Sequence, residues 1–88
     1  MIVPMAKFGD ILISRPAGRE SFLAAKSYLF TKTSENETII LDFKDVKVLA
    51  PSWGDEFITG LRSVYKNRIE ASNIESPAVE AALQVVLA

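Results

Sequence analysis

The sequence of 88 residues contains no cysteine and no histidine. These two absences exclude disulfides, thiol nucleophiles, zinc sites built on cysteine or histidine, and catalytic pairs of serine or cysteine with histidine. An enzyme with this sequence would have to use carboxylates, lysine, arginine, tyrosine and hydroxyl groups for catalysis. The composition therefore favours a binding module over an enzyme, and we expect no catalysis, no cofactor and no metal.

A surplus of one charge and long apolar runs are also lacking. Ten basic and 11 acidic residues give a formal net charge of -1, and the signs are interspersed, so no basic stripe indicates nucleic-acid binding. Met1 to Lys7 includes Pro4 and has no apolar stretch typical of a signal peptide. No run approaches the roughly 20 residues of a membrane span. We expect a cytoplasmic protein that binds neither nucleic acid nor membrane.

Hydrophobic residues make up 49% of the chain, enough for one core at this length. The sequence contains no repeat or linker, which predicts a single domain over residues 1–88. In its first half, apolar runs at 2–8 and 11–14 flank Gly9-Asp10 and predict a β-hairpin. Helical spacing of apolar residues then predicts a helix over 16–33, with Ser14 as its cap. Its apolar face contains Phe22, Leu23, Leu29 and Phe30.

The second half alternates strands with helices. Residues 38–43 contain three consecutive large aliphatics, typical of a central strand. A helix is predicted from Ser52 to Tyr65, a modest strand over 69–74, and a terminal helix after Ser76-Pro77, where Ser76 would be the cap. This order predicts an α/β fold: a small sheet of about four strands, mixed because it combines the hairpin with parallel crossovers, and three helices mainly on one face. The other face would be exposed or used for contacts.

Polar residues gather at the predicted start of the second helix, and each has two interpretations. Asp55 and Glu56 either complement the helix dipole or form part of a binding surface. Ser52 is either a plain N-cap or a candidate phosphoacceptor. Arg15 is either solvated or pairs with Asp55 or Glu56, and Trp53 anchors either the core or an interface.

The segment 39–57, which reads IILDFKDVKVLAPSWGDEF, resembles the STAS-like family of unknown function. That family has a strand ending in Leu-Asp-Phe and, after a short loop, an aromatic residue, a small residue and Asp-Glu. Ser14-Arg15 before the first helix and Asn73 near the last strand match it as well. More distantly, the order of elements resembles STAS domains such as the anti-sigma factor antagonists, which dock on ATPases of the histidine-kinase type.

The resemblance implies a non-catalytic regulatory module that docks on a protein partner, such as a histidine-kinase-type ATPase. In antagonists, a serine at the start of the corresponding helix is phosphorylated, but here that position is Pro51 and Ser52 follows it. The resemblance therefore implies docking on a partner, but not the regulation of docking by phosphorylation at this position. The expected partner-binding residues are Arg15, Pro51, Ser52, Trp53, Asp55 and Glu56.

Two further expectations concern other surfaces. Some STAS domains bind nucleotides, so the resemblance also permits a sensor of nucleotides or small molecules at the carboxyl ends of the strands. The chain is shorter than usual STAS domains and would leave a sheet edge unpaired, which predicts either a homodimer through that edge or a complex in which another chain adds a strand there.

Overall fold

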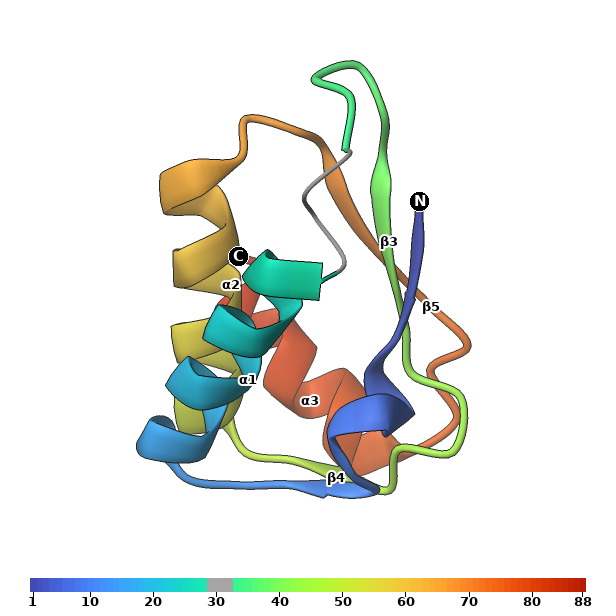
Figure 1. The fold of residues 1–88 in the computed structure, drawn as a ribbon. Helices are drawn as coiled ribbons and strands as arrows, with labels where there is room; N and C mark the ends of the chain where they lie inside the picture. Colours follow the sequence, from blue (N-terminus) through green and yellow to red (C-terminus); the bar gives the residue numbers. More distant parts are fainter. Residues whose placement is uncertain (29–32) are drawn as a thin grey trace.

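Short strands alternate with helices through most of the chain (Figure 1). The computed structural model describes residues 1–28 and 33–88. The elements are, in order, β1 (Ile2–Pro4), the 3-10 helix η1 (Met5–Phe8), β2 (Ile11–Leu12), α1 (Arg15–Tyr28), β3 (Ile39–Asp42), β4 (Val48–Leu49), α2 (Pro51–Val64), β5 (Ile69–Ser72) and α3 (Pro77–Val86).

The strands form two small parallel sheets, with strand orders β1-β3-β5 and β2-β4. The predicted hairpin and the single mixed sheet of about four strands are therefore wrong, because the described residues form five short strands in two parallel sheets. Met5 to Phe8 form a 3-10 turn between β1 and β2 instead of continuing a strand. This turn buries Met5 and brings the Phe8 ring within 6.1 Å of the Trp53 ring. The burial of Met5 and the packing of the partly buried Phe8 against the core outweigh the local turn signal of Gly9-Asp10.

Within residues 1–28 and 33–88, one face of the three-stranded sheet is covered and the other is open. Val3, Ile39 and Leu41 point to the covered face and are fully buried. Ile2, Pro4 and Glu70, on the opposite face, are exposed. Figure 1 shows the three helices on one side of these strands. The expectation that the helices lie mainly on one face is confirmed.

Helices α1 and α2 pack closely because glycine lies where they cross. A Cβ on Gly18 would lie 2.5 Å from the backbone oxygen of Trp53, and one on Gly60 would lie 2.6 Å from the Phe22 ring. Beneath this crossing, the rings of Trp53 and Phe57 stack with centroids 5.1 Å apart and planes at 11°. Side chains larger than hydrogen at positions 18 and 60 would force the helices apart.

The helix starts partly follow the predicted caps. Ser14 adopts a left-handed φ of 75° and its hydroxyl accepts a hydrogen bond from the Ala17 N–H, as a cap does. α2 begins at Pro51 with Ala50 as N-cap, so the prediction that Ser52 is the cap is wrong: proline, with no N–H to satisfy, occupies the first helical position. Ser76 does precede α3, but its hydroxyl donates to the Lys47 carbonyl oxygen.

Two other boundaries differ from the predictions. The prediction extended the first helix to Thr33, whereas α1 is described as far as Tyr28 and Thr33 is not helical. Leu29 and Phe30, expected on its apolar face, lie outside the described residues. β5 ends at Ser72, two residues before the predicted end.

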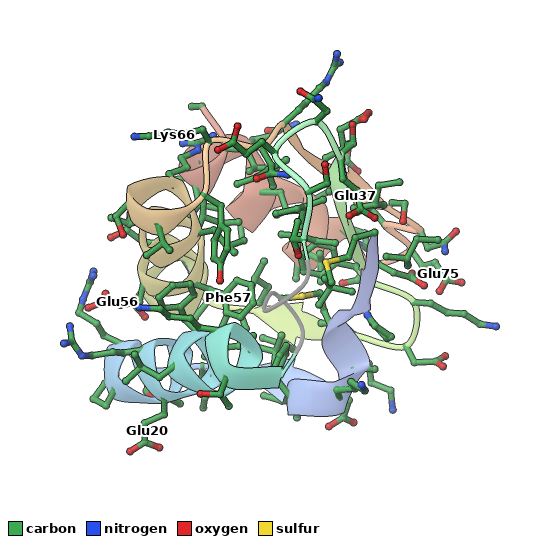
Figure 2. The ribbon with its side chains drawn as sticks, turned by 45° about the horizontal axis from the view of Figure 1, so that its top comes forward. Glu20, Glu37, Glu56, Phe57, Lys66 and Glu75 are labelled. Carbon is green, nitrogen blue, oxygen red and sulfur yellow. The ribbon has the colours of Figure 1, made fainter. Side chains whose placement is uncertain are left out.

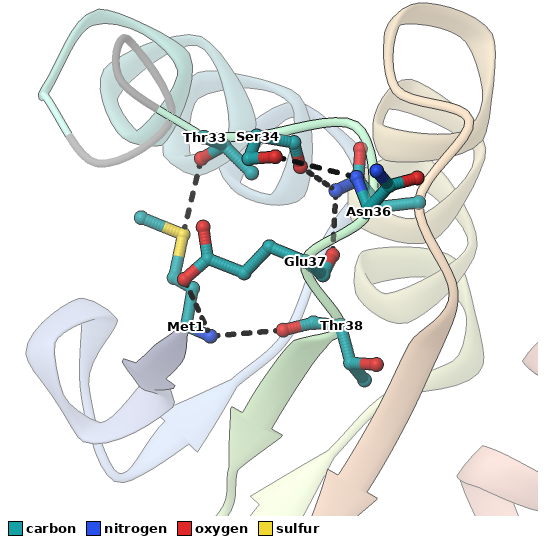
Figure 3. Close-up of polar contacts among 7 residues, drawn as sticks. Met1, Thr33, Ser34, Asn36, Glu37 and Thr38 are labelled. Carbon is teal, nitrogen blue, oxygen red and sulfur yellow. Dashed lines mark hydrogen bonds and ion pairs between the residues drawn. The ribbon is translucent and has the colours of Figure 1, made fainter.

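A polar network fixes the amino ends of the sheet strands (Figure 3). The Met1 ammonium donates to the Thr38 carbonyl oxygen at 2.9 Å and pairs with the Glu37 carboxylate at 3.0 Å. The hydrogen bond from this ammonium lowers the pKa of Glu37. Asn67 donates to the carbonyl oxygens of Ser34 and Glu37. The turn before β3 is thereby held against both β1 and the loop that leads into β5.

We predict that Gly18→Ala destabilises the fold. Alanine improves helix propensity by roughly 0.5–1 kcal/mol, but overpacking against the Trp53 backbone costs about 1–3 kcal/mol. The net loss should appear as a lower free energy of unfolding in urea. Gly54→Ala is the matched control on α2, because its Cβ would lie 3.4 Å from Val86 and fits with little movement. Equal stability of the two variants would contradict the packing described here.

Candidate functional site

An ion cluster links the first turn of α1 to the second turn of α2. Arg15 Nη1 lies 3.0 Å from Asp55 Oδ2 and 3.7 Å from Glu56 Oε1. The Arg15 and Asp55 side chains are each 54% exposed, and Glu56 is 26% exposed. The hydrogen bond with Asp55 raises the pKa of Arg15. We call these three residues the Arg15 cluster. Of the two interpretations of Arg15, a solvated side chain or a pair with Asp55 or Glu56, the structure supports the pair.

The other expected partner-binding residues lie around the start of α2. Pro51 is exposed at the first helical position and Ser52 is half-buried beside it. Trp53 is 2% exposed and lies in the core, stacked on Phe57. Of its two interpretations, the structure supports the core anchor. The buried Trp53 ring is therefore not part of the exposed surface.

A shallow depression of about 270 Å³ between α1 and α2 extends the Arg15 cluster. Glu56 belongs to the Arg15 cluster and also lines this depression. Figure 2 shows it on the side of α2 nearest α1. Thr59 lines the depression and its hydroxyl donates to Asp55 Oδ1 at 3.4 Å. Leu23, in the same lining, is 48% exposed. The remaining lining residues are Arg19, Phe22, Gly60 and Ser63.

Apart from Glu56, the residues that line this depression were not among the expected site residues. Their signal is helical spacing: Arg19 and Leu23 follow Arg15 at intervals of four, and Thr59 and Ser63 follow Asp55 at the same intervals. Residues at these spacings share one helix face, so the two stripes meet where the helices pack side by side. The stripes were inconspicuous because their residue types are ordinary for solvated helix faces.

A second polar group lies at the carboxyl ends of β3 and β5. Asp42 Oδ1 accepts hydrogen bonds from Asn73 Nδ2 at 2.9 Å and from the Lys44 N–H at 3.0 Å. The Asn73 hydrogen bond, followed by the Lys44 N–H, lowers the pKa of Asp42. Asn73 has a φ of 53°, a left-handed conformation that asparagine tolerates better than most residues. Asp42 thereby ties the two strand ends together.

Beside these strand ends lies a depression of about 330 Å³, where the alternative hypothesis expected a ligand. Its lining contains the carboxylates of Asp45 and Glu75 and one ammonium, that of Lys47. Lys47 Nζ also lies 3.9 Å from Asp10 Oδ2. Carboxylates therefore outnumber the single cation here.

In residues 1–28 and 33–88, no group of three or more acidic side chains could hold a metal ion. No helix in these two ranges has the length and apolar character to cross a bilayer.

Comparison with known families adds a decisive observation. Residues 25–78 match the family described as STAS-like domain of unknown function (DUF4325). The chain belongs to this family. No curated protein and no solved structure matches the chain significantly.

The match runs from the last turn of α1 to the start of α3 and covers more than half of the chain. It includes Asp42, Asn73, Asp55 and Glu56, whereas Arg15 lies before it. The carboxylates of the Arg15 cluster and the tie between the strand ends thus fall within the family region.

We predict that Asp42→Asn lowers stability at neutral pH and that this difference shrinks in acid. Because the pKa of Asp42 is lowered on folding, its contribution is fully present above its unfolded pKa and is lost as pH falls through the folded pKa, from about pH 5 downward. The measurement is the melting temperature of both proteins against pH. Asn73→Gly, which keeps the left-handed backbone but removes the amide, should behave similarly. Parallel curves for wild type and variant would contradict this assignment.

Proposed function

We propose that this STAS-like domain is a non-catalytic regulatory module that docks a protein partner through the exposed face of α1 and α2. The docking face comprises the Arg15 cluster, Pro51 and Ser52 at the start of α2, and the adjoining depression. The observation that carries the proposal is the Arg15 cluster itself, an ion-paired group that spans two helices and remains open to solvent.

Exposed ion pairs add little to stability because water already solvates both charges and salt screens them. Such charges have larger effects on association, where they steer the encounter and select the partner. The adjoining depression contributes the half-exposed Leu23, against which an apolar partner side chain can pack. The face therefore combines an apolar contact with a polar border, as protein interfaces do.

A histidine-kinase-type ATPase is the partner class that we propose, because STAS domains that antagonise anti-sigma factors dock on such ATPases. With proline at position 51, docking here does not depend on phosphorylation at that position. Whether Ser52 accepts phosphate is a separate hypothesis, which mass spectrometry after incubation with the ATPase and ATP would test.

We predict that reversing both carboxylates, Asp55→Arg with Glu56→Arg, weakens binding to such an ATPase at least about tenfold. Calorimetric titration with an ATPase of this type from the same organism measures the effect. The matched control reverses the exposed Glu20 and Glu35, and Figure 2 shows Glu20 pointing away from α2. Unchanged affinity of the double variant, or equal loss in the control, would contradict the proposed docking face.

A charge exchange separates docking from a purely structural role. Arg15→Asp with Asp55→Arg preserves an ion pair between the helices but reverses both charges seen by the partner. We expect wild-type stability and lost binding. Full recovery of binding in the exchanged variant would show that the cluster acts only inside the domain.

The depression at the strand ends supports a second candidate function, a small-molecule sensor. Its two carboxylates disfavour nucleotides, because phosphates would meet like charges. We predict that GTP, ATP and cyclic nucleotides leave the melting temperature unchanged, whereas a true ligand raises it by mass action. A rise with any of them that Lys47→Ala abolishes would favour the sensor over the docking module.

A further inference from the structure

The three-stranded sheet has two edges, and they differ in what they offer another strand. β1 contains Pro4, which lacks an N–H, and continues directly into η1. Its helix-facing residue, Val3, is fully buried. Proline at an edge and a bend after it are devices that prevent strand addition. The β1 edge is therefore blocked.

The β5 edge is open. In the parallel ladder with β3, the Ile39 N–H donates to the Arg68 carbonyl oxygen and the Phe43 N–H donates to that of Ser72. The alternation of such a ladder directs the N–H and C=O groups of Ile69 and Ala71 away from β3. In the described part of the chain, no strand pairs with that side of β5.

The core is also incompletely covered at this edge. Ile69 and Ala71 face the helices yet are only half-buried, whereas their neighbours Ile39 and Leu41 on β3 are fully buried. A strand added beside β5 would satisfy its free backbone groups and cover these two side chains in one step.

The charges of Arg68, directly before β5, and of Glu70 in β5 indicate which strand fits this edge. Arg68 and Glu70 lie on the exposed face two residues apart, with Arg68 Nε 3.8 Å from Glu70 Oε2. If two copies of β5 pair antiparallel about a two-fold axis through Ile69, Arg68 of each copy lies opposite Glu70 of the other. The four charges then alternate in sign. A register centred on Glu70 would place the two glutamates directly opposite each other, which is unfavourable.

We propose that the domain forms a homodimer in which the β5 edges of two copies pair antiparallel, centred on Ile69. The partner is a second copy because the arrangement of Arg68 and Glu70 is complementary to itself. The two three-stranded sheets become one continuous six-stranded sheet. None of these residues belongs to the Arg15 cluster, so this inference does not depend on the docking proposal and each dimer keeps two docking faces.

Sedimentation equilibrium up to millimolar concentration tests the association. We expect a monomer–dimer equilibrium that Arg68→Glu or Glu70→Arg alone weakens about tenfold, because each creates two like-charge contacts. The exchange of both residues should restore wild-type association. Lys26→Glu and Glu20→Lys, exposed charge reversals on α1, are the matched controls. A monomer at every concentration, or a dimer unaffected by the single reversals, would overturn the proposal.

Single cysteines test the register, since the chain has no cysteine of its own. In the proposed dimer the two copies of position 69 lie about 5.5 Å apart between Cα atoms, within the range of a disulfide. The two copies of position 70 lie about 8 Å apart, beyond it. Mild oxidation should therefore cross-link Ile69→Cys and not Glu70→Cys. The opposite pattern would overturn the register, and cross-linking of neither variant would overturn the edge itself.

Discussion

The close approach of α1 and α2 is the constraint on which the rest of the structure depends. Gly18 lets the backbone of α1 reach that of Trp53, and Gly60 admits the Phe22 ring against α2. The same approach brings Arg15, at the start of α1, within 3.0 Å of Asp55 on α2. One packing requirement therefore both closes the core and assembles the exposed ion cluster. Trp53 lies at this crossing, with its backbone against Gly18 and its ring buried in the core.

The sheets are small, with three strands in one and two in the other. With helices on one face only, the domain has few layers in which to bury a ligand, and its distinctive chemistry lies on surfaces. The proposed docking face lies on the two helices, the Asp42–Asn73 hydrogen bond joins the carboxyl ends of β3 and β5, and the backbone groups proposed to pair with a second copy lie along β5. These features use separate residues. The two proposed interactions, with a partner through the helices and with a second copy through the sheet, would therefore not compete for the same residues.

Regular periodicity made some of this predictable from the sequence. The aliphatic run at 39–41 indicated a central strand, and the apolar stripes of the last two helices indicated helices that cover it. The resemblance to the STAS-like family indicated Arg15, Asp55 and Glu56 as site residues. Local signals failed where tertiary packing competes with them. Gly9-Asp10 indicated a hairpin turn, but Met5 and Phe8 pack into and against the core, and the chain before Gly9 forms a 3-10 turn instead. Ser52 reads as a cap although Pro51 already starts the helix. The depression beside Leu23 is formed by side chains of both α1 and α2, so the residue pattern of either helix alone does not predict it.

The central claim is that the α1–α2 face is the surface that meets the partner. Chemical-shift mapping by nuclear magnetic resonance on the isotope-labelled domain, titrated with a histidine-kinase-type ATPase, tests it most directly because it reports every backbone amide at once. We predict that the perturbed amides cluster in residues 15–23 and 51–63. Perturbations confined to the strand ends at 42–47 and 73–76, or to the open face of the sheet, would contradict it.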